Sequence, residues 1–428
     1  MNYNEKLLKE SKDFVFLSLK MIRPEYLNIR RIIKDKAILK LFEAVHEYGG
    51  ALRFVGGAVR DALAGIEGFE IDLATDLTPD ELVEACAEKG LKTVSIGLKF
   101  AKTGVIINND VLEVSSLHKP VKESVSDFAF TDDWNADAAS RDLTINAVYA
   151  DEEGNVFDYY NGIDDLEKGV VRFIGNADEK IKEYPIRILR FFRFYSIFSK
   201  TEPDLKALKA SVENKDLLKN VAVELIRDEF FKILVTQNAP KVLQIIKEND
   251  ILDFLLPSQM NTQNLQRLDW LVYVNNLPTD ALRRLFILFL PDAALAENLA
   301  IRLHLTKVQK ARLIAFAKFS FDALQFHNMP YVKKVVFLHG KEFTKDKILF
   351  ALALQNETTF DVKALFEQID EFEIPVFPLN GKDLIEMGMN EGLPIKEILA
   401  KLKGIWLDSD FEMSFDELKK RAAQMMKK

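Results

Sequence analysis

The stretch RFVGGAVRDALAGIEGFEIDLAT (Arg53–Thr75) constrains the fold of this chain more than any other part of it. An apolar, strand-like run ends at Gly56 and Gly57, and a helix-like segment containing Arg60 follows. Glycine lets the backbone approach a ligand closely, and the start of a helix presents free N–H groups to phosphate. The order of strand, glycine pair and helix therefore predicts a phosphate cradle.

Two acidic residues, Glu70 and Asp72, lie near the end of the same stretch. Side chains at i and i+2 of an extended segment point to the same face, and two carboxylates there can hold a hard divalent cation through oxygen. Taken alone, the glycines also fit an ordinary tight turn, and the acids also fit a solvated strand edge. Together they predict a triphosphate cradle beside a metal site, which is what nucleotidyl transfer requires.

The chain divides by pattern into an α/β part and a helical part. Strand-like and helix-like runs alternate from Leu52 to about Gly175, and after Ala177 glycine is sparse and helical spacing dominates. The predicted strands include Val94–Ile96, Gly104–Ile107 and Leu112–Val114, and the predicted helices include Ala37–Tyr48 and Pro79–Lys89. The predicted domains are an α/β catalytic head (30–175), a helical neck (176–240), and a helical body and tail (241–428).

Composition is typical of a globular intracellular enzyme. The 428 residues are 48% hydrophobic and 29% charged, enough for several domains. A single cysteine, Cys86, excludes an internal disulfide and fits a reducing compartment. No apolar run reaches membrane-spanning length, and the first residues carry acids without the apolar core of a signal peptide. We therefore expect a cytoplasmic protein. The five histidines are scattered, without zinc-ligand spacing.

The net charge of −8 is uneven along the chain. Residues 301–350 contain ten Lys or Arg and three acids, so this window carries a charge of +7. Such a window fits either a solvated helix face or a surface that follows the phosphates of a nucleic acid. Lys333 and Lys334 are the RNA-binding candidates within it.

Several motifs, in order, resemble those of the class II tRNA nucleotidyltransferase and bacterial poly(A) polymerase family, which includes the CCA-adding enzymes. The matching segments are GGAVRD (Gly56–Asp61), EIDLAT (Glu70–Thr75), LEVSSL (Leu112–Leu117, which contains Glu113), SRDLTINA (Ser140–Ala147), FDYYNGIDDLEKGVVRFIG (Phe157–Gly175), IRILRFFRF (Ile186–Phe194) and PLNGKDLIEMGMNEGLPI (Pro378–Ile395). This resemblance implies an α/β nucleotidyltransferase head followed by an all-α neck, body and tail. It also implies tRNA, ATP and CTP as substrates and Mg²⁺, or Mn²⁺, as cofactor.

The resemblance also assigns roles to residues. The implied metal ligands are Glu70, Asp72 and Glu113, and the implied nucleotide-binding residues are Gly56, Gly57, Arg60, Arg141, Asp142, Asn146, Tyr184, Arg187, Arg190 and Arg193. Asn146 is expected one helical turn after Asp142. The last three arginines recur every third residue and therefore share one helix face. Arginines on an apolar helix are costly unless they meet anions, either phosphates or neighbouring acids.

The chain departs from the family pattern at functional positions. Glu70 and Tyr184 both replace an aspartate, and Leu225 replaces an arginine. Lys102 lies where a basic His-Gly-Thr-like segment is usual, and the loop Lys119–Phe130 has no arginine. Tyr184 can donate as well as accept, so discrimination of C and A against U and G is expected to weaken.

The resemblance leaves three alternatives open, besides a binding module unrelated to nucleotides. The first is an active CCA-adding enzyme, which includes partial addition of C or A only. The second is a poly(A) polymerase. The third is a degenerate relative that keeps tRNA binding with weak or no nucleotide addition. Pro185 suits the first turn of a helix. If the helix begins there, Glu183 takes the base-reading role that the resemblance assigns to position 184.

Overall fold

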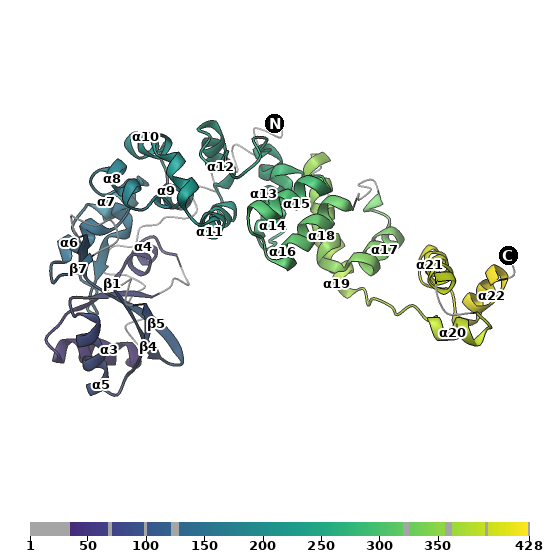
Figure 1. Cartoon of the computed structure of the whole chain (residues 1–428), viewed down its shortest axis with the longest axis horizontal. Helices are drawn as coiled ribbons and strands as arrows, with labels where there is room; N and C mark the ends of the chain where they lie inside the picture. The colour runs from purple at the N-terminus through teal and green to yellow at the C-terminus, as the bar shows by residue number, and fades with distance from the viewer. Residues whose placement is uncertain are drawn as a thin grey trace. The chain divides into compact units, whose positions relative to one another are not determined.

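A computed structural model describes residues 35–66, 71–97, 101–120, 128–319, 325–355, 362–389 and 393–426. The chain forms two compact units, Met1–Phe254 and Leu255–Lys428 (Figure 1). The predicted head and neck fall in the first unit, and the predicted boundaries near residues 175 and 240 remain predictions. Residues 1–34 and Glu70 lie outside the described residues.

A seven-stranded mixed sheet organises the described head, in the order β3-β4-β5-β2-β1-β8-β9. Its strands are β1 (Leu52–Val55), β2 (Asp72–Thr75), β3 (Lys92–Gly97), β4 (Lys102–Ile107), β5 (Asp110–Ser116), β8 (Val148–Ala150) and β9 (Val156–Asp158). Strands β2 and β5 are parallel, and their other neighbours pair antiparallel. A separate hairpin joins β6 (His118–Pro120) to β7 (Phe128–Phe130). The α/β head and its predicted strands are confirmed.

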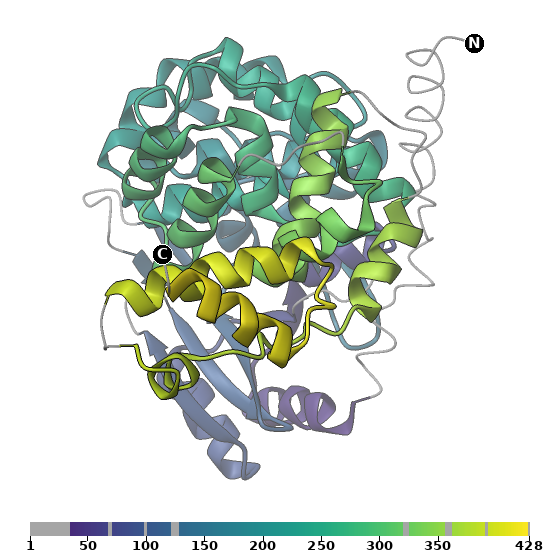
Figure 2. The same cartoon turned by 90° about the vertical axis from the view of Figure 1, so that its right-hand side faces the viewer.

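One face of the sheet is covered by α3 (Lys36–Glu47) and α5 (Pro79–Glu88), which pack on each other (Figures 1 and 2). The rings of Phe42 and Phe54 lie 5.3 Å apart in this layer. Cys86 of α5 is fully buried, and burial raises the pKa of its thiol to about 11.

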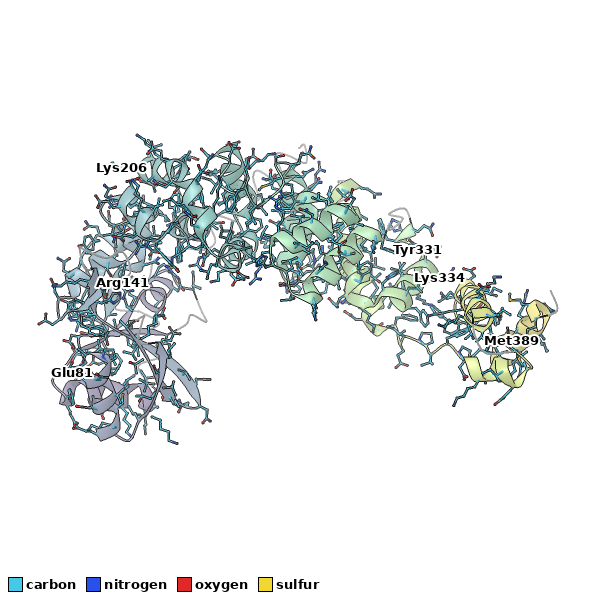
Figure 3. The ribbon with its side chains drawn as sticks, viewed as in Figure 1. Glu81, Arg141, Lys206, Tyr331, Lys334 and Met389 are labelled. Atoms are coloured by element: carbon cyan, nitrogen blue, oxygen red, sulfur yellow. The ribbon has the colours of Figure 1, made fainter. Side chains whose placement is uncertain are left out.

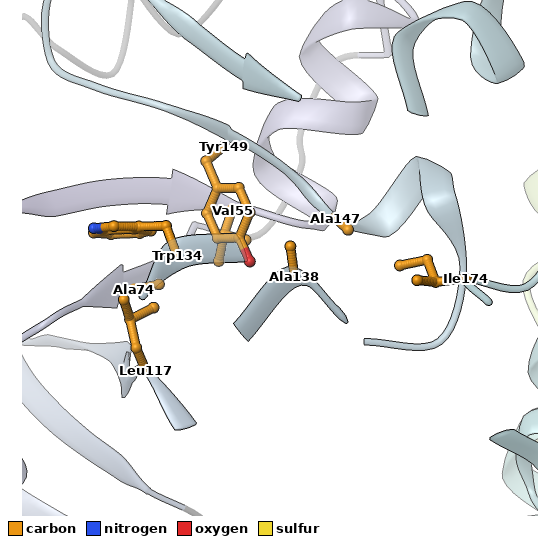
Figure 4. Packing of buried hydrophobic residues seen from close by; sticks show 8 residues of the cluster. All are labelled: Val55, Ala74, Leu117, Trp134, Ala138, Ala147, Tyr149 and Ile174. Carbon is orange, nitrogen blue, oxygen red and sulfur yellow. The ribbon is translucent and has the colours of Figure 1, made fainter. Parts of the chain in front are cut away.

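The other face is covered over only part of its width. Figure 4 shows the cover, an apolar cluster in which the ring of Trp134, from α6 (Trp134–Ser140), meets that of Tyr149 at 5.4 Å. Over β3, β4 and β5 the same face leaves Val94, Ile96 and Val111 exposed.

Helices complete the first unit. They are α4 (Gly57–Leu63), α7 (Gly162–Lys168), α8 (Ala177–Glu183), α9 (Arg187–Phe198), α10 (Leu205–Glu213), α11 (Val223–Leu234) and α12 (Ala239–Glu248), with 3-10 turns at Thr144–Asn146 and Lys215–Asn220. Helix α9 packs on α11 and α12 and buries Phe191 and Phe192 completely. Because the apolar residues of α9 occupy its inner faces, its arginines are left on one side.

The second unit is helical throughout its described residues. Its helices are α13 (Thr262–Val274), α14 (Ala281–Phe289), α15 (Ala293–Arg302), α16 (Lys307–Lys318), α17 (Met329–His339), α18 (Lys341–Gln355), α19 (Val362–Glu371), α20 (Gly381–Glu386), α21 (Leu393–Asp408) and α22 (Phe415–Met426). Within the described residues, none of the chain's helices combines the length and apolar character that a membrane span needs.

Two sets of ion pairs fix this second unit. Inside it, Asp346 accepts from Arg283 and Arg312, each at 2.6 Å, and Arg312 also reaches Asp280 at 2.8 Å. At the tail, Lys333 and Lys334 of α17 pair with Asp410 at 3.0 Å and Asp408 at 2.8 Å. Trp406 and Phe337 add an edge-to-face aromatic contact to the same junction.

Candidate active site

A cleft of about 850 Å³ lies in the first unit, between the sheet and helices α9 and α11. It is lined by Gly56, Gly57, Arg60, Asp61, Asp72, Lys102, Ser115, His118, Asp137, Ser140, Arg141, Asp142, Asn146, Tyr184, Arg187, Arg190, Arg193, Phe194, Ile197 and Lys232. Basic side chains outnumber acidic ones along these walls, so the cleft attracts anions although the whole chain is acidic. All of the predicted nucleotide-binding residues line it, and Arg141 is labelled in Figure 3.

Two of the predicted carboxylates lie on adjacent strands. Asp72 of β2 and Glu113 of β5 are register partners in the parallel pair, so their side chains share one face of the sheet. Lys102 of β4 donates to the Glu113 carboxylate at 2.5 Å. A Cβ added to Gly57 would lie 3.6 Å from Asp72 Oδ2, which places the glycine turn directly beside this carboxylate.

The glycine turn requires glycine, because Gly56 has φ +60° and ψ −118°. Arg60, one turn into α4, is almost completely buried and donates to Asn146 Oδ1 at 2.6 Å and to Asp61 at 2.8 Å. Its guanidinium also lies 4.7 Å from the ring centre of Phe194. Arg60 is thus held rigidly at one wall of the cleft.

Asp142 and Asn146 meet as predicted, although they do not lie on one helix. Helix α6 ends at Ser140, and a short 3-10 turn at Thr144–Asn146 brings Asn146 Nδ2 to Asp142 Oδ1 at 3.0 Å. Burial disfavours the charged form of Asp142. The Arg190 guanidinium, at 2.6 Å, and the hydrogen bonds outweigh this and hold the pKa of the carboxyl well below its usual range.

The three arginines of α9 share one face, as predicted, and each meets a carboxylate. Arg187 pairs with Glu183 at 2.6 Å, Arg190 with Asp142 at 2.6 Å, and Arg193 with Glu229 of α11 at 3.2 Å. Neighbouring acids therefore neutralise the arginines in this structure, and all three still line the cleft.

Comparisons with known proteins agree with this geometry. Residues 52–172 match the model described as the poly A polymerase head domain, and residues 202–262 match the probable RNA and SrmB-binding site of polymerase A. The zebrafish (Danio rerio) protein named CCA tRNA nucleotidyltransferase 1, mitochondrial, is 31% identical over 380 residues, with 86% of each chain covered. This chain belongs to the CCA tRNA nucleotidyltransferase family. Its resemblance to that family is confirmed, and with it the nucleotidyltransferase class of enzyme.

Other members of the family cover nearly the whole chain. The human protein of the same name is 28% identical over 418 residues, covering 95% of this chain and 93% of its own. The crystal structure of the Bacillus stearothermophilus CCA-adding enzyme in complex with CTP has a TM-score of 0.71 at 22% identity. It covers 92% of this chain and 98% of that one. The fold of an α/β head followed by helical domains is therefore shared.

The segment 183–187, which is predicted to read the base, joins two helices. Helix α8 ends at Glu183, Tyr184 is half exposed, and α9 begins at Arg187 rather than at Pro185. The Arg187 guanidinium donates to Glu183 Oε2, to the Lys180 carbonyl and to the Ser140 carbonyl. Glu183, rather than Tyr184, is thus the side chain that meets Arg187.

Sequence reasoning missed a second network in the cleft. Asp137 is almost completely buried and accepts from Arg141 Nε at 3.1 Å, from the Tyr149 hydroxyl at 2.7 Å and from the His118 backbone N–H at 3.3 Å. Burial raises the pKa of Tyr149, so its phenol stays a donor. The spacing of four residues between Asp137 and Arg141 is a signal that could have found this pair.

The predicted RNA-binding lysines are not part of the cleft. Lys333 and Lys334 lie in the second unit, where Figure 3 labels Lys334, and both are paired with tail aspartates. As a metal site, the described residues supply two adjacent carboxylates, Asp72 and Glu113, and no cluster of three or more potential ligands. Two carboxylates suit Mg²⁺, which keeps several waters and commonly takes its other ligands from substrate phosphates.

Proposed function

We propose that this chain adds C and A to the 3′ end of tRNA, taking the nucleotides from CTP and ATP. The observation that carries the proposal is Asp72, which lines a cleft with arginine-rich walls and has Glu113 as its register partner on the neighbouring strand. The RNA 3′-hydroxyl attacks the α-phosphate, the bond to the β-phosphate breaks, and pyrophosphate leaves. The names and folds of the family relatives support this reaction. We propose that the protein acts in the cytoplasm.

Mg²⁺ is the proposed cofactor, with Mn²⁺ as a substitute. Asp72 and Glu113 would hold it, and we propose Glu70 as a third ligand from outside the described residues. When bound, the cation lowers the pKa of the attacking hydroxyl and neutralises charge on the leaving pyrophosphate. Lys102 donates to one oxygen of the Glu113 carboxylate at 2.5 Å, and the second oxygen would be the one that meets the cation.

The arginines of the cleft would bind and orient the triphosphate. Arg190 and Arg193 are held by single carboxylates, so each guanidinium keeps further N–H donors for phosphate oxygens. Asn146 fixes Arg60, and Asp137 fixes Arg141, which leaves little side-chain freedom to lose on binding. Gly56 and Gly57 allow the triphosphate to approach the backbone beside Asp72.

Base selection would use Arg187 together with Glu183. A carboxylate accepts from the exocyclic amine of C or A and repels the carbonyl oxygen that U or G presents there. Tyr184 and Arg187 line the cleft, and Glu183 has the required charge and contacts Arg187 at 2.6 Å. We therefore propose that Glu183 supplies the acceptor that the family motif normally takes from the next residue.

The test is incubation of the full chain with tRNA lacking its 3′ CCA and each labelled NTP, with Mg²⁺ or Mn²⁺. Two additions from CTP followed by one from ATP support the proposal. A long tract from ATP alone would instead identify a poly(A) polymerase, and tRNA binding without any addition would identify a degenerate relative. Asp72→Ala, at the end of a strand, should reduce addition by about a thousandfold with an unchanged melting temperature. Full activity in that variant would overturn the assignment.

A further inference from the structure

The face of the sheet that carries Asp72 and Glu113 continues across β3, β4 and β5 as an exposed apolar surface. Side chains alternate along a strand, so Val111 and Glu113 of β5 point to the same face. In register, Glu113 opposes Gly104, and Gly104 opposes Val94 of β3. The carboxylates and this surface are therefore parts of one face.

The exposure of this surface is large for aliphatic side chains. Val94 and Ile96 are each 39% exposed and Val111 is 50% exposed. Val105 and Ile107, on the opposite face of β4, are 0% and 4% exposed under α5. We call the surface formed by Val94, Ile96, Ile106 and Val111 around Gly104 the β3–β5 platform.

Gly104 gives the platform its continuous shape. A Cβ at this position would lie 2.7 Å from both Val111 Cγ1 and Val94 Cγ2, and 2.8 Å from Ile96 Cδ1. The three side chains therefore close over the glycine from both neighbouring strands. The result is a smooth aliphatic surface three strands wide, or roughly 10 Å across.

Charged side chains border the platform on two sides. Lys92 of β3 is exposed and opposes Ile106, and Lys102 lies next to Glu113 at the border with the cleft. Lys102 is paired with Glu113, and Lys92 is a second cation beside the apolar side chains. Such a surface suits single-stranded nucleic acid, because bases present apolar faces and the backbone presents phosphates. A neighbouring protein strand would not account for continuity with the catalytic carboxylates.

We propose that the β3–β5 platform binds the single-stranded 3′ end of the RNA acceptor, with its last bases against Val94, Ile96 and Val111. This inference rests on the proposed function, since it places the RNA strand that supplies the attacking hydroxyl. RNA approaching along the platform meets Glu113 and then Asp72, so its terminal hydroxyl arrives where the carboxylates are. The platform thus positions the acceptor, while the arginine walls hold the nucleotide.

Val94→Glu and Val111→Glu test the proposal in the full chain. Each substitution places a charge at an exposed position, so the variants should fold as the wild type does. The melting temperature of each variant checks this. Each variant replaces an apolar contact to a base with a negative charge that repels the RNA backbone, so Kd and KM for tRNA lacking CCA should rise about tenfold. The KM for CTP should stay unchanged. Val83→Glu is the matched control, because Val83 is an exposed residue of α5, and this variant should bind RNA as the wild type does.

The outcomes separate the inference from the proposed function. Unchanged RNA affinity in both platform variants, or an equal change in Val83→Glu, would overturn the platform. So would a change of sedimentation coefficient in Val111→Glu, because it would show that a second copy of the chain covers the surface. A tRNA with no single-stranded 3′ nucleotides should bind all variants equally. If wild type adds no nucleotide, the proposed function fails, while these affinities still decide the platform.

Discussion

The cleft of the first unit and the interior of the second unit both hold arginines against aspartates, but in different settings. In the second unit, Arg283 and Asp346 are 6% and 1% exposed, and the network with Arg312 and Asp280 balances its charges. In the cleft, the paired arginines still line an opening in which basic groups are in excess. An arginine–carboxylate pair is therefore no sign of function by itself. Its access to a charged cavity is what distinguishes the two settings.

The largest expected effect comes from breaking the buried network. Asp346→Ala leaves Arg283 and Arg312 without their shared carboxylate, so the free energy of unfolding should fall by about 3–5 kcal/mol. Nucleotide addition per folded molecule should not change. Denaturant unfolding and a single-turnover assay measure the two quantities. Replacing the pair together, with Arg283→Met and Asp346→Leu, should recover part of the loss, because Arg312 then keeps only Asp280.

The corresponding change in the cleft is Asp142→Asn, which removes the charge that faces Arg190. We expect about 2 kcal/mol less stability at pH 7. The pKa of Asp142 is lowered in the folded state, so its contribution is complete above the ordinary carboxyl pKa of about 3.9. The contribution is lost as pH falls through the lowered value, and the difference between variant and wild type should shrink in acid. A constant difference from pH 3 to pH 8 would contradict this pairing. Unlike Asp346→Ala, this variant should also change the KM for NTP.

A third effect concerns selectivity alone. Glu183→Ala should reduce the preference for CTP and ATP over UTP and GTP by about tenfold, because Arg187 loses its carboxylate. Stability should change little, since Glu183 is partly exposed. Competition between labelled NTPs gives the ratio. If the ratio stays the same in Glu183→Ala and improves in Tyr184→Asp, position 184 is the one that matters.

The smallest effect is expected at the tail junction. Lys334→Asp should weaken tRNA binding, with a loss below about 1 kcal/mol and a reduced dependence on salt. Adding Asp408→Lys restores the ion pair without returning a cation to position 334, so binding should stay weak if Lys334 meets phosphate. Recovery in the double variant would mean that the lysine only holds the tail. Lys401 is the exposed control, because Lys403 lies over the ring of Phe337.

The sequence predicted those features that depend on local pattern. The glycine turn, the strands of the head and the shared face of Arg187, Arg190 and Arg193 all follow from spacing. The partners of those arginines do not, because Glu229 and Asp142 come from other elements that only the fold brings near. The helical link expected between Asp142 and Asn146 was wrong because α6 ends at Ser140, although the two side chains still meet.

Other features depended on burial that a single sequence does not show. His118 was grouped with scattered histidines, yet it lines the cleft above Asp137. In the sequence, the valines of β3 and β5 resemble ordinary strand residues. Only the structure shows that the face of the sheet on which they lie is uncovered. The assignment of Glu70 as a metal ligand lies outside the described residues and stays a prediction.

The buried thiol of Cys86 has a practical consequence for experiments on this protein. With no other cysteine in the chain and a pKa of about 11, it stays unreactive toward maleimides and iodoacetamides near neutral pH. Any cysteine introduced on the surface would therefore be the one residue labelled, without first removing the native one. Val111→Cys with a small fluorophore would report RNA arrival through quenching, and Tyr184→Cys would report the nucleotide. The two steps of a catalytic cycle could then be timed separately with Cys86 left in place.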